Sequence, residues 1–365
     1  MQILVTGAKG FIGKHLTSLL KEEGYDVLPF DIDDDISLLK EYINKCDFLV
    51  HLAGVNRPLT NEEFYDGNVN FTKKVVDMVK ASNREIPIIL SSSIQASLDN
   101  DYGKSKKMAE DYLFSSHLPV YVYRLANVFG KWCRPNYNSV CATFCYNIAH
   151  DLPIQIRDRD YIVNFNYIDD ICLEFLQCIK GNRKPSNEIL SVTPVFQCSL
   201  GHLADELYRF KKDIESEQHL PLIKDDFTLK LFITFCDYLT DPTYSLNKAK
   251  DNRGYFQEIY KNEKYGQISI NMSYPHIVKG NHYHLYKNEK FMTVVGHCLI
   301  KERNIHTNEL LTYNVKGEDC QIVDMLPEYT HNIENIGSTN SVTIMWISHI
   351  YQEETADTYK EEVDK

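Results

Sequence analysis

The sequence of 365 residues predicts two successive domains, an α/β domain with a doubly wound parallel sheet and an all-β barrel or jelly roll. Two observations support this prediction. In the first half, short apolar strands alternate with helical patterns, and the first strand runs into a glycine-rich loop. In the second half, short strands separated by turns dominate. We place the domains at residues 1–245 and 246–365.

The first domain opens with a strand at Gln2–Thr6 and a helix at Phe11–Glu23, in which apolar residues recur at helical spacing. A second strand, Asp26–Phe30, ends at Asp31. Further strand-like runs separated by helical patterns lie at Phe48–Leu52, Pro87–Leu90 and Val120–Tyr123. This βαβ alternation implies a parallel sheet.

Two helices are expected near the end of the first domain, at Leu200–Tyr208 and Phe227–Leu239, with the polar run Lys211–Gln218 between them. After these helices the sequence pattern changes to one of short strands. These are expected at Gln267–Asn271, Phe291–Val295, Cys298–Arg303, Leu310–Val315, Gln321–Leu326 and Val342–Ile347.

Composition excludes several function classes. A net charge of -12 argues against a nucleic-acid-binding surface, and no run approaches the roughly 20 apolar residues of a membrane span. The apolar start Met1–Val5 leads into the glycine loop, so we interpret it as a strand and not as a signal peptide. The ten cysteines are scattered singly, as expected of reduced thiols in a cytoplasmic protein.

The glycine loop predicts a dinucleotide site. Gly7 permits a tight turn, Gly10 lets backbone N–H groups approach a pyrophosphate, and Gly13 permits close packing of the helix on the strand. Asp31 follows Gly13 by 18 positions, where an acid can bind a ribose hydroxyl. A merely glycine-rich turn would not account for that acid.

Tyr102 and Lys106 are spaced i and i+4, which places both on one face of a helix. The lysine ammonium is expected to lower the pKa of the phenol, so that Tyr102 can pass a proton to a carbonyl oxygen that receives a hydride. A hydroxyl from the run Ser91–Ser93 would bind the same oxygen.

The residues leave the choice of nicotinamide open. Asp31 and the acids Asp33–Asp35 suit a free ribose 2′-hydroxyl and favour NADH slightly. Lys9 in the loop and Arg57 nearby are candidate partners for the 2′-phosphate of NADPH.

The second domain carries a candidate metal set. His282 and His284, at i and i+2, project from the same side of a strand, Glu289 follows a short turn later, and His331 comes 47 positions after His284. Three imidazoles and a carboxylate suit Zn²⁺ or a similar divalent ion. The alternative is a metal-free site with His282 as a base. We expect structural or surface roles for His276, His297, His306 and His349.

The first domain resembles the extended short-chain dehydrogenase/reductase family, over about residues 1–245, and this implies a Rossmann-like fold. The markers are Thr6–Gly13, His51–Gly54, Asn68, Ser91–Ser93, Tyr102/Lys106, Arg124–Gly130 and Asn166–Asp170. The resemblance implies cofactor contacts from the glycine loop, including Phe11 and Ile12, from Leu52, Ala53 and Gly54, and from Tyr102 and Lys106. It also implies that Ser93 is the catalytic hydroxyl.

Members of this family usually act on nucleotide-activated sugars. The resemblance places Asn127 near the nucleotide-sugar and the segment 131–139, which includes Arg134 and Asn138, in the substrate region. Arg134 or Lys131 is a candidate contact for a diphosphate, although a solvated surface charge explains either residue equally well.

The second domain resembles the cupins, through Gly280-x-His282-x-His284-x4-Glu289-x6-Gly296 and His331-x3-Asn335. Leu326-Pro327-Glu328 departs from the Pro-x-Gly that usually precedes the second motif. Asp251–Glu258 resembles the opening D-x-R-G-x-F-x-E of dTDP-4-keto-sugar epimerase cupins. That likeness implies that Arg253 and Glu258 contact the nucleotide-sugar and that His282 is the general base. A bound Zn²⁺ or a donor such as Lys279 would stabilise the negative charge that develops on the sugar.

In their order along the chain, both halves resemble the CapF-type bifunctional enzymes of capsule and O-antigen synthesis. The resemblance implies C3 epimerisation of a UDP-2-acetamido-2,6-dideoxy-4-hexulose in the cupin and C4 reduction by NADPH in the first domain. The product would be UDP-2-acetamido-2,6-dideoxy-L-talose, and we expect a homodimer. The alternative is a one-step reductase whose cupin is a metal-stabilised binding or dimerisation module.

Overall fold

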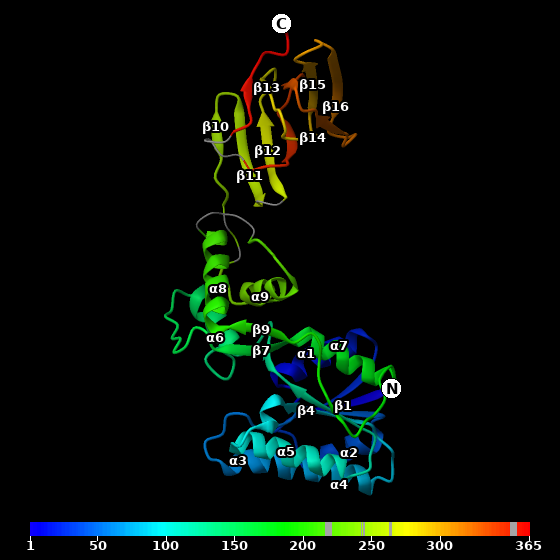
Figure 1. Ribbon diagram of the computed structural model, residues 1–365. Coiled ribbons are helices and arrows are strands. Elements are labelled where there is room, and N and C mark those ends of the chain that lie inside the picture. Colours follow the sequence, from blue (N-terminus) through cyan, green and yellow to red (C-terminus); the bar gives the residue numbers. More distant parts are fainter. Residues whose placement is uncertain (216–220, 242, 244, 263–264, 351–355) are drawn as a thin grey trace. The chain divides into compact units, whose positions relative to one another are not determined.

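The computed structural model describes residues 1–365 except 216–220, 242, 244, 263–264 and 351–355 (Figure 1). By internal contacts the chain divides into two compact units, Met1–Arg209 with Ile223–Pro242 and Phe210–Leu222 with Thr243–Lys365. The domain boundary between 245 and 246 stays a prediction. No helix in the described ranges is long and apolar enough to cross a membrane.

The first unit is built on a six-stranded sheet in the order β2-β1-β3-β4-β5-β8, and all of its strand pairs are parallel. This confirms the doubly wound α/β prediction. The strands are β1 (Gln2–Thr6), β2 (Asp26–Phe30), β3 (Phe48–His51), β4 (Ile88–Ser93), β5 (Val120–Leu125) and β8 (Ile189–Leu190).

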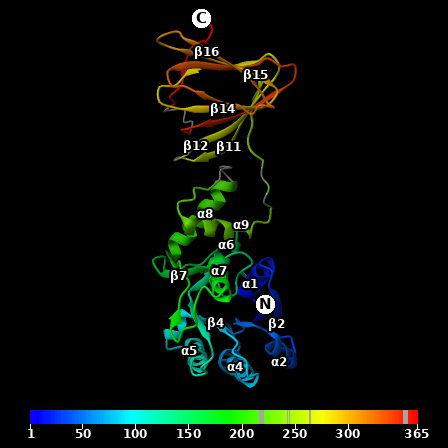
Figure 2. The same ribbon diagram turned by 90° about the vertical axis from the view of Figure 1, so that its right-hand side faces the viewer.

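Helices cover both faces of this sheet (Figures 1 and 2). One face carries α1 (Phe11–Glu22) and α7 (Ile168–Ile179), and the other carries α2 (Ile36–Lys45), α4 (Phe71–Ala81) and α5 (Asp101–Phe114). The short helices α3 (Glu62–Phe64), η1 (Tyr65–Asn70) and η2 (Ile94–Ser97) precede α4 and α5. Buried aliphatic side chains of the sheet, α2 and α4 fill the core, among them Leu4, Leu39, Leu49, Val75 and Val122.

The first unit also contains a smaller, three-stranded sheet, in the order β6-β7-β9. Its strands are β6 (Asn127–Phe129), β7 (Ile162–Tyr167) and β9 (Phe196–Ser199), and the neighbouring helices are α6 (Val140–Ala149), α8 (Leu200–Glu215) and α9 (Asp226–Cys236). The predicted helix at Leu200–Tyr208 is therefore too short, because α8 continues into the polar run. Residues 216–218 of that run lie outside the described residues.

The second unit consists of two antiparallel sheets, β10-β11-β12-β19-β14-β17 and β16-β15-β18-β13-β20 (Figure 2). This confirms the all-β prediction. The strands are β10 (Ala249–Asp251), β11 (Gly254–Asn262), β12 (Gly266–Ser273), β13 (Val278–Tyr283), β14 (Glu289–Val295), β15 (His297–Asn304), β16 (Leu310–Lys316), β17 (Ile322–Met325), β18 (Tyr329–Asn335), β19 (Ser341–Ile347) and β20 (Tyr359–Lys360).

Two long strands of this unit, β11 and β18, were not expected from the sequence. Most residues of β11 are partly exposed, and β18 buries Thr330, His331 and Asn332 in succession. Neither strand therefore shows the alternation of apolar and polar residues that identifies a half-buried strand. His331 belongs to the site described next, whereas Thr330 donates to the Glu361 carbonyl and Asn332 donates to the Asn281 side chain.

Two candidate active sites

The glycine loop has the shape that a dinucleotide needs. Gly7 adopts a φ of +71°, and its N–H donates to the carbonyl of Phe30 at 2.8 Å. A Cβ atom on Gly13 would lie 2.2 Å from the carbonyl oxygen of Gly7, so only glycine permits α1 to pack this closely. Helix α1 begins at Phe11 and Ile12, directly after Gly10, and its first N–H groups are oriented for an anion.

Leu52, Ala53 and Gly54 follow β3 and lie beside this loop. The Ala53 N–H donates to the Thr6 hydroxyl at 3.3 Å, and a Cβ on Gly7 would lie 2.8 Å from the Ala53 nitrogen. Both segments therefore meet at the carboxyl edge of the sheet, where doubly wound folds bind nucleotides. The expected cofactor residues are brought together here.

Asp31 reaches back to the glycine loop. Its carboxylate accepts a hydrogen bond from the Lys9 N–H at 2.6 Å, and the Lys9 ammonium pairs with Asp33 at 3.0 Å. The hydrogen bond and charge of Asp33 raise the pKa of Lys9. The lysine expected as a phosphate partner therefore stays protonated and is paired with Asp33. Arg57 stacks over the ring of Tyr137 at 5.7 Å, within the segment expected to bind substrate.

Tyr102 and Lys106 lie in α5, as the spacing predicts, but the expected effect of the lysine on the phenol is wrong. Burial raises the pKa of Tyr102, and a hydrogen bond with Ser93 offsets only part of that rise. The Lys106 ammonium instead donates to the carbonyl of Ser91 at 3.2 Å. Burial lowers the pKa of Lys106 to about 8, because the charged form loses its hydration.

The three serines of β4 have different surroundings. Ser91 donates to the His51 carbonyl at 3.4 Å, and Ser92 donates to Glu110, a buried carboxylate. Ser93, at the end of the strand, forms the hydrogen bond with Tyr102. The structure therefore brings Ser93, not its two neighbours, to the tyrosine.

Asn68, one of the family markers, is buried and joins three segments. Its side chain accepts from the Val55 N–H at 3.0 Å and donates to the Ser105 hydroxyl at 3.0 Å. A Cβ on Gly54 would lie 2.6 Å from its oxygen. Asn68 thus fixes the loop after β3 against α5, which carries Tyr102.

Of the candidate substrate residues of this unit, Asn127 begins β6, and Arg134 and Asn138 lie in the loop before α6. Asn127 donates to the Asn164 carbonyl at 3.1 Å, and Asn138 is exposed. The Arg134 guanidinium lies 5.0 Å from the centre of the Tyr137 ring. Lys131, the alternative contact for a diphosphate, forms an ion pair with Asp169 at 3.1 Å instead.

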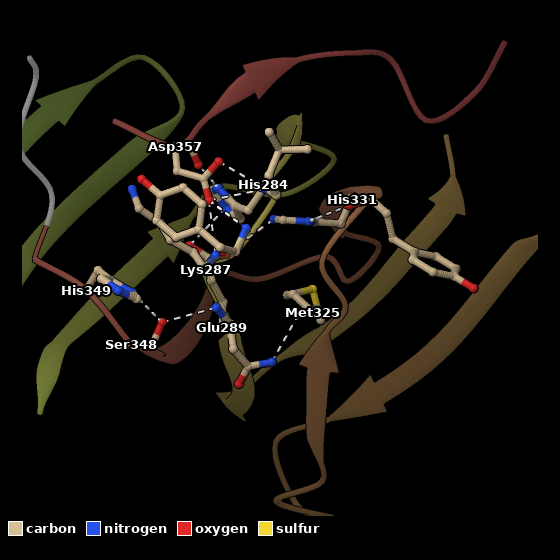
Figure 3. A network of polar contacts seen from close by, with 12 residues as sticks. His284, Lys287, Glu289, Met325, His331, Ser348, His349 and Asp357 are labelled. Atoms are coloured by element: carbon tan, nitrogen blue, oxygen red, sulfur yellow. Dashed lines mark hydrogen bonds and ion pairs between the residues drawn. The ribbon is translucent and has the colours of Figure 1, made fainter. Parts of the chain in front are cut away.

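The second site is the set of four residues expected to hold a metal. Donor atoms of His282, His284, Glu289 and His331 all lie within 4.8 Å of one another. They come from the end of β13, the residue after it, the start of β14 and the middle of β18. Figure 3 shows His284, Glu289 and His331 pointing toward one another. The Nε2 atoms of His284 and His331 are each 3.3 Å from an oxygen of Glu289.

The hydrogen-bond partners of the two buried histidines indicate that a cation belongs between these groups. Nδ1 of His284 faces the carbonyl of Asp357, and Nδ1 of His331 faces the carbonyl of Tyr329 at 3.3 Å. A carbonyl only accepts, so both Nδ1 atoms carry the proton. Both buried Nε2 atoms then present lone pairs to Glu289 and have no hydrogen-bond partner in the described part of the chain. Such a cluster of acceptors needs protons or a metal ion, and the donor types fit Zn²⁺.

The site opens into a cavity of about 510 Å³ whose lining includes Arg253, Lys279 and His282. Arg253 is held by Asp251, with its Nη2 2.7 Å from the carboxylate. The Lys279 ammonium donates to the Asn271 side chain at 2.8 Å, and burial lowers its pKa.

His282 is the member of the metal set that is partly exposed, and burial together with His331 lowers its pKa to about 4. Its imidazole is therefore neutral at pH 7, as a ligand or a base must be.

Glu258, expected at the sugar, is missing from the described residues that line the cavity. Its carboxylate accepts from the Gln267 side chain at 3.0 Å and pairs with Lys261. The bulge in β11 between Glu258 and Tyr260 changes the strand's register next to this residue. Asp357, which binds His284, was not expected. It lies 73 positions from that histidine, and its flanking sequence carries no motif.

Comparison with known proteins relates both units to nucleotide-sugar enzymes. Residues 3–192 match the NAD dependent epimerase/dehydratase family, and residues 249–359 match the polysaccharide biosynthesis C-terminal domain. The UDP-2-acetamido-2,6-beta-L-arabino-hexul-4-ose reductase of Pseudomonas aeruginosa is 40% identical, with 98% of each chain covered.

Solved structures agree with this relationship. The capsular polysaccharide assembling protein CapF from Staphylococcus aureus superposes with a TM-score of 0.92 and 41% identity, covering 100% of both chains. A UDP-glucuronic acid 4-epimerase from Bacillus cereus in complex with NAD has a TM-score of 0.56 and 20% identity, covering 65% of this chain and 98% of its own. The latter likeness concerns the fold alone.

Proposed function

The chain belongs to the NAD dependent epimerase/dehydratase family and, over its whole length, to the CapF-like proteins; from this membership we propose that it is a UDP-sugar enzyme of capsular polysaccharide synthesis. Its substrate would be a UDP-2-acetamido-2,6-dideoxy-4-hexulose. The cupin would epimerise C3 and the first unit would reduce the C4 ketone. The product would be UDP-2-acetamido-2,6-dideoxy-L-talose. One observation carries the reductase half: Tyr102, Lys106 and Ser93 cluster at the carboxyl edge of a glycine-loop sheet.

In the reductase step, the residues of this chain handle the proton. A bound nicotinamide supplies the hydride to C4. Tyr102 donates its hydroxyl proton to the C4 oxygen, and Ser93 donates a hydrogen bond to the same oxygen. Lys106 lies one helical turn from Tyr102. Its ammonium is directed to the Ser91 carbonyl, so we assign Lys106 to cofactor binding and not to lowering the pKa of the phenol.

In the epimerase step, the C4 ketone acidifies the hydrogen at C3. His282 removes that proton, and a proton from the solvent is then added to the opposite face of C3. A Zn²⁺ held by His284, Glu289 and His331 would supply Lewis-acid stabilisation of the negative charge at the C4 oxygen. Lys279 lines the same cavity and offers an ammonium donor to that charge. If His282 is instead a fourth zinc ligand, a different group must act as the base.

The two steps share one functional group, which gives the fusion a chemical reason. The C4 ketone is required for epimerisation and is then consumed by reduction, so the reduced product can no longer epimerise. We propose NADPH as the reductant on the family resemblance. The acids around Lys9 support NADH as the alternative, and steady-state rates with each cofactor distinguish them.

Isotope exchange tests the epimerase half. The purified protein is incubated with its 4-keto sugar in D₂O without nicotinamide, and deuterium at C3 is measured by NMR. We expect exchange at C3, and its absence would refute the epimerase assignment. In that case the cupin would be a metal-stabilised binding or dimerisation module. NMR of the product after addition of NADPH then identifies the reduced sugar, and sedimentation velocity tests the proposed homodimer.

A further inference from the structure

The last ten residues of the chain, 356–365, which we call the C-terminal strap, are bound to the strand that carries His282. Strand β20 pairs antiparallel with the end of β13, with His282 opposite Lys360. The rings of Tyr283 and Tyr359 stack with their centres 5.2 Å apart. The strap therefore extends the sheet at the point where the first metal ligands are placed.

The far end of the strap is also anchored in the barrel. Val363 is 1% exposed, and Arg303, itself 6% exposed, donates to the carbonyls of Glu362 at 2.8 Å and Val363 at 3.0 Å. The Thr330 hydroxyl, next to His331, donates to the Glu361 carbonyl. These contacts bind the strap to β15 and β18, so it is an ordered part of the second unit.

Asp357 connects the strap to the loop that follows His284. This residue is 2% exposed. Its carboxylate accepts three hydrogen bonds from consecutive backbone N–H groups, Leu285 at 3.0 Å, Tyr286 at 2.9 Å and Lys287 at 3.0 Å (Figure 3). Hydrogen bonds from N–H groups to a carboxylate are stronger than those between neutral partners. Asp357 thus fixes the backbone between two of the candidate ligands, His284 and Glu289.

The main chain of Asp357 acts on His284 directly. Its carbonyl accepts the hydrogen bond from Nδ1 of His284, which keeps the proton on Nδ1 and the lone pair on Nε2. That Nε2 atom is the one that lies 3.3 Å from Glu289. Partners of this kind set the tautomer and the ring orientation of histidines that bind metals. One residue therefore holds both the side chain and the following loop.

We propose that Asp357 is a positioning residue of the metal centre, and that the C-terminal strap sets the metal affinity of His284, Glu289 and His331. This inference rests on the metal binding proposed above. Reciprocity follows from linkage: if the strap raises the affinity for the metal, bound metal must stabilise the strap to the same extent.

A competition titration of the full-length protein with a fluorescent zinc chelator tests the proposal. Asp357→Asn presents an amide NH₂ to the three N–H donors and should weaken zinc binding by about 10- to 100-fold, as is typical of outer-shell partners. Asp364→Asn is the matched control, because Asp364 lies in the same strap but pairs with Lys301 at 2.8 Å and its side chain is 63% exposed. The control should bind zinc like the wild type.

Hydrogen exchange measured by mass spectrometry provides a readout that a general loss of stability would not reproduce. Zinc should slow exchange in peptides from 284–288 and from the strap in the wild type, and should do so less in Asp357→Asn. If Asp357→Asn does not fold, Asp357→Glu, which keeps the charge but displaces it, takes its place with the same expectation.

The possible outcomes separate the two proposals. A wild-type protein that binds no zinc would overturn the metal site itself. A wild-type protein that binds zinc, together with an Asp357 variant of equal affinity and equal protection, would leave the metal site intact and overturn the role of the strap.

Discussion

Glu289→Gln tests the candidate metal centre by removing the negative charge that its carboxylate would offer to the metal ion. Glu289 is 6% exposed, and its two oxygens lie 3.3 Å from Nε2 of His284 and Nε2 of His331. The substitution keeps the size of the side chain and removes its charge. The introduced amide also presents a donor where a cation should bind.

The expected magnitude follows from the size of the site. A cation among donor atoms that all lie within 4.8 Å of one another is less than about 4 Å from the carboxylate, which attracts each unit of its charge by at least about 4 kcal/mol at an effective dielectric constant of about 20. A loss of about 4 kcal/mol weakens metal binding by about 10³-fold. Zinc at roughly 1,000 times its Kd stabilises the fold by about 4 kcal/mol, so the variant should lose almost all of that gain. At roughly 4 °C per kcal/mol, the metal-dependent part of Tm is about 15 °C.

The assay is thermal unfolding of the second unit's transition with zinc and with EDTA. EDTA should lower Tm in the wild type and leave Glu289→Gln unchanged. Glu318→Gln serves as the control, because that side chain is 76% exposed, and it should keep the wild-type response. A Glu289→Gln protein that keeps the full EDTA-sensitive shift would refute the assignment of this carboxylate as a ligand.

Three further predictions concern the first unit. Tyr102→Phe should lower the rate of NAD(P)H oxidation by about 10²- to 10⁴-fold in a spectrophotometric assay. The control is Tyr112→Phe, which lies on the same helix with its hydroxyl bonded to a surface aspartate and should keep the wild-type rate. Full turnover by Tyr102→Phe would exclude Tyr102 as the proton donor. Burial lowers the pKa of Lys106 from 10.5 to about 8, so the unfolded chain binds more protons between these values and stability should rise with pH across that window. Lys106→Met should remove this rise in urea unfolding, and an unchanged pH slope would contradict the assignment. Arg124 binds both carboxylate oxygens of the buried Glu110, at 2.9 and 2.7 Å. Glu110→Gln removes this charged partner and should lower the free energy of unfolding by about 3–5 kcal/mol. A loss below about 1 kcal/mol in a urea titration would show that the pair is not strongly coupled.

The features that the sequence predicted well are local. Gly7 and Gly13 are needed by a single turn and the helix after it, and the i, i+4 spacing of Tyr102 and Lys106 is a property of one helix. In the cupin, residue type and spacing were enough to identify His282 and His284 as neighbours. These inferences need no knowledge of distant segments, because the geometry of one turn or one strand decides them.

What the sequence could not predict is the surroundings of these residues. The pKa of Tyr102 rises because neighbouring segments bury the phenol, and Lys106 is directed to the Ser91 carbonyl across the helix–strand interface. Glu258 matches its motif but is bonded to Gln267 on the next strand. Strand pairing and bulges decide such placements, and the motif alone does not contain them.

Residue patterns were sufficient to predict the two fold classes, the glycine loop, the tyrosine–lysine helix and the set of four candidate ligands. The folded chain was needed to show which serine meets Tyr102, which imidazole nitrogens carry protons, and which residue holds His284. Protonation and orientation depend on desolvation and on hydrogen-bond partners, which motifs do not contain. Asp357 and His284, for example, lie 73 positions apart in the chain and meet only when the sheets form.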